Sequence, residues 1–327
     1  IGIVGLPNVG KSTLFKAITR QNVTIANYPF ATIDPNVGVV PVPDERLQKL
    51  TELSKSKKTV PAIVEFYDIA GLVRGANKGE GLGNQFLAHI RETQAIVIVL
   101  RVFKSEDITH VEGTVNSLRD LETILTELAL KDMETIDRRL GKLEGEARTG
   151  DKKAVRNLEI LKKIKETLGV SSLAVELRDE EIVRELSLLT AKKQLHLLNG
   201  SENEVPPDLL ELIKKLGGDY LVVDLATSTG VPELTQKAYE TLDLISFFTT
   251  GEDETRAWTI EQGTKAPQAA GVIHTDFETK FIRAEVINWK KLVEAGGWPQ
   301  AKSKGLMRLE GKEYVMADGD VMEVRHG

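Results

Sequence analysis

The chain has 327 residues, of which 41% are hydrophobic and 28% charged, and this length favours two or three domains over a single compact core. Cysteine is absent from the sequence, which excludes disulfides and thiolate metal sites and is typical of a reducing cytosol, so we expect a cytoplasmic protein. A formal net charge of −6 at pH 7 argues against general coating of nucleic acid and against a DNA partner, and no apolar run approaches the ~20 residues that a membrane span needs.

The chain opens on a phosphate-binding motif. Residues 1–13 read IGIVGLPNVGKST, a buried strand that runs directly into the pattern G-x-x-x-x-G-K-S. The two glycines let consecutive backbone N–H groups turn around an anion, Lys11 brings positive charge to the outer phosphates, and the Ser12 hydroxyl is placed for Mg²⁺. A helix over 13–20 then points its N-terminus at the phosphates. The residues predicted to bind a nucleoside triphosphate here are Asn8, Val9, Gly10, Lys11, Ser12 and Thr13, with Lys11 also catalytic.

Two later segments are predicted to complete the metal site. A strand-like run over 63–67 leads into D-x-x-G at 68–71, in which the carboxylate of Asp68 reaches Mg²⁺ through water and the Gly71 amide senses the γ-phosphate. Between the two motifs, Thr32 lies in a loop of the kind that closes over Mg²⁺ when the γ-phosphate is present, with an ordinary surface threonine as the alternative. The predicted metal residues are Ser12, Thr32 and Asp68.

Three compositional regimes follow one another along the chain. Up to Asn116, short β-rich runs alternate with helical stretches, which is typical of a parallel sheet with crossover helices. From 118 to 168 the sequence is rich in Leu, Glu, Lys and Arg, and its apolar residues recur at 4-3 and 3-4-3 spacing, so we predict two antiparallel helices paired as a coiled-coil hairpin. Strands return at 195–199, and short strand-like segments around glycine-rich turns from 247 onward indicate a small β-rich module.

The strand over 195–198 ends in N-G-S-E at 199–202, in the position where guanine-specific switches carry N-K-x-D. In that motif the aspartate accepts hydrogen bonds from guanine, whereas adenine presents a lone pair at N1, so the loss of the aspartate removes a penalty against ATP. We therefore predict ATP in preference to GTP, with a plain strand-end turn as the alternative interpretation of this segment. The residues predicted to bind the base are Asn199, Gly200, Ser201 and Glu202.

With these motifs in place, the sequence resembles the Obg-like ATPases of the YchF family, P-loop proteins that are similar to GTPases yet prefer ATP. The resemblance covers nearly the whole chain and rests on 2–13, 27–41, 68–92, 199–202 and 256–284. It implies a G-domain-like P-loop domain with a parallel α/β sheet, an inserted helical hairpin and a C-terminal ubiquitin-like (TGS) domain. The expected boundaries are 1–116 and 189–246 for the two parts of the nucleotide-binding domain, 117–188 for the hairpin and 247–327 for the TGS domain.

The resemblance also implies a catalytic role for a histidine. The residue after D-x-x-G is Leu72, where Ras-type enzymes place the glutamine that orients the attacking water, and the family replaces that glutamine by a hydrophobic residue. The family's substitute histidine corresponds to His110, whose neutral imidazole could orient or deprotonate water near pH 7. A lone histidine is otherwise commonly structural. Asn8 matches the loop asparagine that helps to hold K⁺ in some relatives, so K⁺ stimulation is a further hypothesis.

The expected partners are ATP, ADP and the ribosome, which the resemblance implies together with slow ATP hydrolysis. Between Lys131 and Glu166 the hairpin has 11 Lys or Arg against 8 Asp or Glu, a local charge of +3, which is either a solvated helix face or a surface for ribosomal RNA or protein. The basic residues of its second helix are Lys152, Lys153, Arg156, Lys162, Lys163 and Lys165. The alternatives are a GTP-hydrolysing switch of the Obg type and an ATP-dependent binding protein with negligible turnover.

Overall fold

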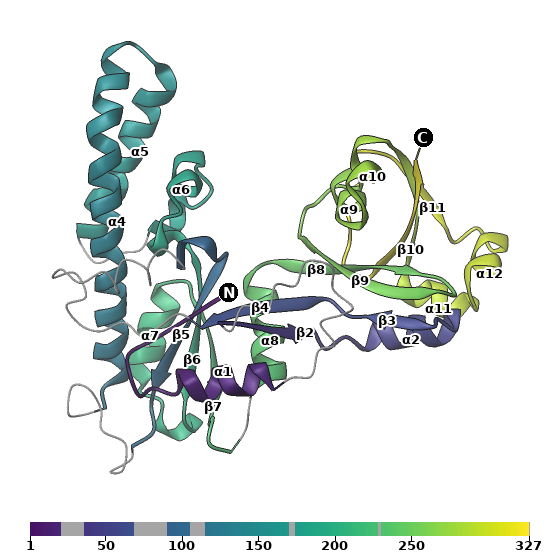
Figure 1. Ribbon diagram of the computed structural model, residues 1–327, viewed down its shortest axis with the longest axis horizontal. Coiled ribbons are helices and arrows are strands. Elements are labelled where there is room, and N and C mark those ends of the chain that lie inside the picture. The colour runs from purple at the N-terminus through teal and green to yellow at the C-terminus, as the bar shows by residue number, and fades with distance from the viewer. Residues whose placement is uncertain (21–35, 69–89, 105–114, 170–173, 228–229, 327) are drawn as a thin grey trace. The chain divides into compact units, whose positions relative to one another are not determined.

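The computed structural model describes residues 1–20, 36–68, 90–104, 115–169, 174–227 and 230–326 (Figure 1). Three of the predicted site residues, Thr32, Gly71 and His110, lie outside these ranges. The chain divides into two compact units. The first contains Ile1–Arg20 and Phe66–Val231, and the second contains Val39–Glu65 and Pro232–Gly327.

A six-stranded sheet carries the first unit. Its strands in spatial order are β2 (Val37–Pro41), β4 (Ile63–Asp68), β1 (Gly2–Val4), β5 (Ala95–Arg101), β6 (Lys193–Asn199) and β7 (Asp219–Val223). Parallel pairing joins β1 to β4 and β5, β5 to β6, and β6 to β7. The central strand β5 is buried along its whole length, as its continuous apolar run predicts.

The five parallel strands β4, β1, β5, β6 and β7 bring their carboxyl ends to one edge of the sheet. In the register of the sheet, Ile3 lies beside Asp68 and Arg101 lies beside Asn199. The helices of this unit are α1 (Lys11–Thr19), α4 (Ser117–Arg148), α5 (Lys152–Gly169), α6 (Glu181–Leu186) and α7 (Pro207–Lys215), with short 3-10 helices at η2 (Ala174–Leu177), η3 (Leu189–Ala191) and η4 (Glu202–Glu204). The carboxyl edge therefore gathers the phosphate loop, the end of β4 and the end of β6.

Helices α4 and α5 form the antiparallel hairpin that the apolar spacing predicts (Figure 1). Asn116 is the N-cap of α4, and its side chain accepts a hydrogen bond from the Arg119 N–H group at 3.0 Å. The buried residues between the helices and the segments at their base include Ile136, Leu143, Ala154, Leu161, Ile164 and Leu168. The helices pack through this narrow stripe, and the exposed large apolar residues of the pair are Leu130 on α4 and Val155 on α5.

The basic surface of α5 is partly neutralised by neighbouring acids. Lys153 pairs with Glu181 at 2.9 Å and Arg156 with Glu180 at 2.9 Å. A third pair joins Lys165 to Asp137 of α4 at 2.5 Å. The exposed cations of this helix beyond those three pairs are Lys152, Lys162 and Lys163.

His196 of β6 is expected to make the folded state less stable in acid. Its ring is buried with Nδ1 3.0 Å from the Asp219 carbonyl oxygen, and burial lowers the pKa of His196 from 6.5 to about 4. As the pH falls, the unfolded chain therefore protonates His196 near pH 6.5, whereas the folded chain protonates it only near pH 4. The neutral ring of His196 contributes its full share to the free energy of unfolding above pH 6.5, and this share is lost as the pH falls from 6.5 to 4. The loss is about 1 kcal/mol per pH unit.

Urea unfolding across this pH window measures the effect. The free energy of unfolding of the wild type should fall more steeply with acid than that of His196→Gln, whose amide does not titrate. Equal slopes for the two proteins would show that His196 is not the group responsible.

A second six-stranded sheet carries the second unit. In spatial order its strands are β11 (Arg308–Glu310), β10 (Phe281–Asn288), β12 (Asp320–His326), β8 (Leu244–Thr250), β9 (Glu254–Glu261) and β3 (Lys58–Val60). Pairing is antiparallel between β10 and each of β11 and β12, and between β8 and β9, whereas β12–β8 and β3–β9 are parallel. The sheet is therefore mixed. The sheet of the first unit is parallel from β4 to β7, and its edge strand β2 runs antiparallel to β4, as the Asp68 N–H to Asn36 carbonyl and Val42 N–H to Ala62 carbonyl hydrogen bonds show.

Helix α9 (Ala266–Ile273) covers the core of this sheet. Its buried alanines let the helix approach the strands closely, against Phe247, Val286 and Met322. The other helices of the unit are α2 (Glu45–Ser54), α8 (Val231–Thr241), α10 (Thr275–Thr279), α11 (Trp289–Ala295) and α12 (Trp298–Ser303). Among the helices that the structure describes, none combines the length and the apolar character needed to cross a membrane.

Candidate nucleotide-binding site

The phosphate loop joins β1 to α1 and leaves no room for side chains at its two glycines. A Cβ atom at Gly5 would lie 2.6 Å from the Val99 carbonyl oxygen, and one at Gly10 would lie 2.4 Å from Asn199 Nδ2. Gly10 also has a φ of 110°, which favours glycine. As the N-cap of α1, Gly10 has no side chain that could accept hydrogen bonds from the first N–H groups of the helix. These N–H groups and the helix dipole are therefore available to an anion.

The other loop residues surround this cradle. Asn8 is exposed and has a φ of 63°, a conformation that asparagine tolerates better than most residues. The side chain of Val9 is buried in the core behind the loop. Ser12 and Thr13 lie in the first turn of α1 with exposed side chains, so both hydroxyl groups can reach a ligand at the helix N-terminus.

Lys11 is the cation of the loop, and its side chain is almost fully buried. Its Nζ donates a hydrogen bond to the Leu6 carbonyl oxygen at 2.7 Å, which holds the ammonium group inside the curve of the loop. Burial lowers the pKa of Lys11 to about 8, and the Asp68 carboxylate partly opposes this shift. Phosphate oxygens at the same place would favour the protonated form and so reinforce the charge.

Asp68 ends β4 beside this loop. Burial raises the pKa of its carboxyl group, whereas the charge of Lys11 lowers it. Carboxylate and hydroxyl oxygens are the ligands that Mg²⁺ prefers, and Mg²⁺ takes its remaining ligands from water and substrate phosphates. The exposed Ser12 hydroxyl and the Asp68 carboxylate therefore fit a phosphate-bound Mg²⁺ ion.

Asn199 ties the phosphate loop to the rest of the sheet edge. Its side chain is 4% exposed. The Nδ2 group donates to the Val9 carbonyl oxygen at 2.9 Å, and Oδ1 accepts from the Leu225 N–H group at 3.1 Å. Both ends of the amide are thus used to hold two backbone segments, and the loop is supported before any ligand binds.

Replacing Asn199 by alanine should weaken nucleotide binding by ~10- to 100-fold, because one buried N–H group and one buried carbonyl lose partners worth about 1–3 kcal/mol each. The reference is Asn203→Ala, which removes the same amide from an exposed position four residues later. Isothermal titration with ATP and Mg²⁺ measures the change. Equal affinities for the two variants would mean that the amide of Asn199 does not support the loop.

The turn after Asn199 is closed by its own polar groups. The backbone N–H and the hydroxyl of Ser201 both donate to Glu204 Oε2, at 2.9 Å and 2.5 Å. A Cβ atom at Gly200 would lie 2.6 Å from the Val102 side chain. Glu202 is exposed at the start of η4. The acid that holds the turn is therefore Glu204, which the sequence motif does not include.

Arg101 is a further residue of this edge that motif reasoning does not identify. It ends the apolar strand β5, opposite Asn199 in the sheet, and is fully buried. Its Nε donates to the Phe103 carbonyl oxygen at 3.1 Å, and its guanidinium carbon lies 4.4 Å from the centroid of the Phe103 ring. In the sequence, the signal that could have identified Arg101 is an arginine at the end of an otherwise apolar run.

Two family models match the chain. The model MMR_HSR1, described as "50S ribosome-binding GTPase", matches residues 1–136, and the model YchF-GTPase_C, described as "Protein of unknown function (DUF933)", matches residues 244–327.

Close relatives match over nearly their whole length. "Ribosome-binding ATPase YchF" of Bacillus subtilis (strain 168) is 48% identical, with 99% of this chain and 98% of the relative covered. The protein of the same name from Escherichia coli O157:H7 is 45% identical, with 98% and 97% covered. Among solved structures, the Schizosaccharomyces pombe YchF GTPase is 39% identical with a TM-score of 0.86, and the match covers 99% of this chain and 97% of that chain.

Proposed function

The chain belongs to the YchF family, and on this premise we propose that it is a P-loop ATPase that binds ATP with Mg²⁺, hydrolyses it slowly and associates with the ribosome. The observation that carries the proposal is the phosphate loop, where two glycines without room for side chains, the buried Lys11 and the N-terminus of α1 form one anion cradle. The names of the relatives support ATP and the ribosome as partners. These partners would place the protein in the cytoplasm.

The roles of the residues follow from the cradle. Lys11 and the N–H groups of α1 would bind and orient the outer phosphates and stabilise the charge that develops on them. Mg²⁺, when bound, neutralises charge between the β- and γ-phosphates. Ser12, Thr32 and Asp68 would hold that ion, and Gly71 would sense the γ-phosphate. We assign the orientation of the attacking water to His110, and a K⁺ site to Asn8, as the family resemblance implies.

The preference for adenine over guanine depends on residues 199–202, which stand where guanine-specific proteins carry N-K-x-D. The residues expected at the base are Asn199, Gly200, Ser201 and Glu202. We propose that the first of these holds the loop, as its contacts with Val9 and Leu225 support, and that the following turn borders the base. No aspartate is present at 199–202 to pair with guanine, which favours ATP. A GTP-hydrolysing switch is the second candidate, because the solved relative from Schizosaccharomyces pombe is named a GTPase.

We expect the ribosome to bind the helical hairpin of α4 and α5. On α5, Lys152, Lys162 and Lys163 are exposed cations beyond the three ion pairs that neutralise their neighbours. A surface of this kind would bind ribosomal RNA or an acidic ribosomal protein in a salt-dependent manner.

Phosphate release tests the proposed activity. The purified protein should release phosphate from ATP faster than from GTP, only with Mg²⁺ present, and should co-sediment with ribosomes at low salt. Adding ribosomes to the same assay then shows whether they accelerate ATP hydrolysis. Faster release from GTP would favour the second candidate, and ATP binding without any Mg²⁺-dependent release would leave a binding protein that uses ATP as a structural ligand.

A further inference from the structure

Between the proposed Mg²⁺ residues Thr32 and Asp68 the chain forms β2, α2, β3 and β4, and of these α2 and β3 lie wholly in the second unit. We call residues 44–60 the connecting segment. β3 is the terminal strand of the second sheet and pairs in parallel with β9 along its whole length. A stretch that is adjacent in sequence to the nucleotide motifs is thus built into the fold of the C-terminal unit.

Backbone contacts fix the β3 end of the connecting segment. The Lys57 N–H group donates to the Glu252 carbonyl oxygen at 2.9 Å, and the Ser56 hydroxyl donates to the Gly251 carbonyl oxygen at 2.6 Å. Val60 is fully buried. These contacts continue the strand pairing into the turn before β3, so this end cannot shift without breaking a row of hydrogen bonds.

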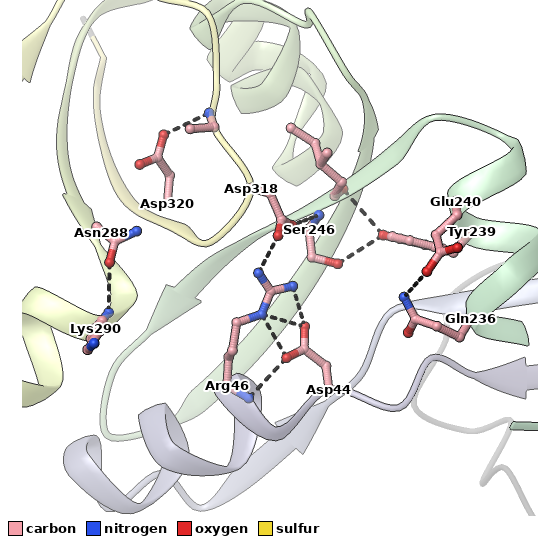
Figure 2. Close-up of polar contacts among 12 residues, drawn as sticks. Asp44, Arg46, Gln236, Tyr239, Glu240, Ser246, Asn288, Lys290, Asp318 and Asp320 are labelled. Atoms are coloured by element: carbon pink, nitrogen blue, oxygen red, sulfur yellow. Dashed lines mark hydrogen bonds and ion pairs between the residues drawn. The ribbon is translucent and has the colours of Figure 1, made fainter. Parts of the chain in front are cut away.

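Arg46 fixes the α2 end (Figure 2). Its guanidinium group lies 2.8 Å from Asp44 Oδ2 and 2.5 Å from Asp318 Oδ2, and its central carbon lies 5.2 Å from the centroid of the Phe248 ring. The other oxygen of Asp318 accepts from the Ser246 N–H group at 3.0 Å. One guanidinium group therefore links the start of α2 to β8 and to the turn before β12.

The turn before β12 is closely packed around this arginine. A Cβ atom at Gly319 would lie 2.6 Å from the Trp289 ring and 3.3 Å from Arg46 Nη1. On the helix itself, Leu47 and Leu50 are buried. The exposed fraction of the Arg46 side chain is 21%, so water screens its ion pairs less than those of a fully exposed residue.

Strand β4 continues from the connecting segment to the nucleotide site. Its residues up to Glu65 belong to the second unit, those from Phe66 belong to the first, and it ends at Asp68. A single strand thus reaches from the anchored segment to the carboxylate proposed for Mg²⁺. Extended backbone in a paired strand transmits a displacement along its length better than a flexible loop would.

We propose that the connecting segment transmits the nucleotide state of the phosphate site to the C-terminal unit, with Arg46 as the positioning residue. The proposal rests on the proposed function, because it requires Asp68 to respond to the γ-phosphate and its Mg²⁺ ion. A ligand shifts a conformational equilibrium only through contacts that differ between the two states. Here the ligand would act on the Asp68 carboxylate at the end of β4, the strand that follows a segment anchored in the second sheet.

Hydrogen exchange of the full-length protein tests this coupling. Exchange of β9 and of the turn leading into β12 is compared with bound ADP and with a non-hydrolysable ATP analogue, both with Mg²⁺. In the wild type the exchange rates should differ by about fivefold or more between the two nucleotides, the lower range of ordinary allosteric coupling. In Arg46→Ala this difference should be lost, while both nucleotides still bind.

Lys57→Ala is the matched control. It removes an ion pair with Asp253 in which the two side chains are 77% and 90% exposed, and it should keep the wild-type difference. If Arg46→Ala unfolds the second unit, Asp318→Asn replaces it, since the amide keeps an oxygen for Ser246 but weakens the pairing with Arg46; the difference should then shrink. A merely structural role for Arg46 would raise exchange equally in both nucleotide states.

Two results would overturn the proposal. One is equal exchange in β9 and in the turn leading into β12 with either nucleotide, when titration shows both to be bound. The other is an unchanged difference in folded Arg46→Ala or Asp318→Asn. Failure of the wild type to bind any nucleotide in the same titration would instead remove the proposed function.

Discussion

Replacement of Lys11 by alanine should reduce ATP turnover by at least ~100-fold and weaken ATP binding, because the variant loses the cation that stabilises developing charge on the outer phosphates. Lys11 is buried, so water screens its charge less than that of an exposed lysine, and its loss should be correspondingly large. Phosphate release and isothermal titration of the variant measure the two effects separately.

The wild type should also lose affinity for ATP as the pH rises. Burial lowers the pKa of Lys11 to about 8, so the ammonium form that attracts phosphate is lost from the free protein above that pH. Once deprotonation dominates, the loss approaches about tenfold per pH unit, because binding must then recover one proton. Titration of the wild type below and above pH 8 measures the slope.

Lys16→Ala is the control for both measurements. It removes an exposed lysine from the same helix and should leave turnover, affinity and their pH dependence unchanged. Full turnover in Lys11→Ala, or an affinity of the wild type that does not change above pH 8, would contradict the placement of this charge at the phosphates.

Replacement of Asp132 by alanine should lower the free energy of unfolding by about 3 kcal/mol, because three donors lose their acceptor at a buried position. The Asp132 carboxylate on α4 accepts the Leu189 N–H group at 2.9 Å and the N–H and hydroxyl groups of Thr190 at 2.8 and 2.7 Å. It thereby attaches the base of the hairpin to the chain that leads into β6.

Neighbouring cations make this joint more sensitive. The Arg91 side chain donates to the Thr135 hydroxyl at 2.6 Å, and Lys192 Nζ donates to the carbonyl oxygens of Arg91 and Thr93. Burial raises the pKa of Asp132, while its hydrogen bonds and the charge of Arg91 lower it. Removing the carboxylate also removes a negative charge that interacts with Lys192 and Arg91.

Urea unfolding compares Asp132→Ala with Asp137→Ala. The second variant removes an acid from the same helix, but its pair with Lys165 has side chains that are 51% and 41% exposed, so its loss should stay below about 1 kcal/mol. If both variants lose the same stability, the buried carboxylate is not what holds the base of the hairpin.

The features that the sequence predicts well are local ones. The phosphate loop needs only a strand, fixed glycines and a following helix, and all of these lie within the first 20 residues. The hairpin follows from apolar residues at helical spacing, and the structure buries Ile136, Leu143 and Leu161 along that stripe. The predicted fold class is confirmed by both family models and by the solved relative.

The second unit contains a feature that local patterns cannot predict. β3 has three residues, too few for a periodic signal, and its neighbours in the sheet lie almost 200 positions further along the chain. Sequence patterns alone therefore assign 39–65 to the nucleotide-binding domain with the rest of 1–116. The contacts of Arg46 and Ser56 with the C-terminal part of the chain place α2 and β3 in the second sheet's unit.

In the candidate site, too, motifs identify some residues and only the structure identifies others. The Asp68 carboxylate is near enough to Lys11 for its charge to oppose the lowering of the Lys11 pKa, and the roles of both residues stay predictions. The sequence identifies Asn199 as a residue of interest, but only the fold shows that both ends of its amide are occupied by backbone groups. Glu204 and Arg101 carry contacts that no motif includes, because a hydrogen bond within a turn and a buried guanidinium depend on the surrounding structure.

The central claim is that the loop at the start of the chain binds a purine nucleoside triphosphate with Mg²⁺ and prefers adenine. Isothermal titration of the wild type with ATP and with GTP, side by side in magnesium buffer, tests it most directly. We expect ATP to bind clearly more tightly than GTP. Tighter binding of GTP would contradict the assignment of the base site, and the absence of binding by either nucleotide would contradict the account as a whole.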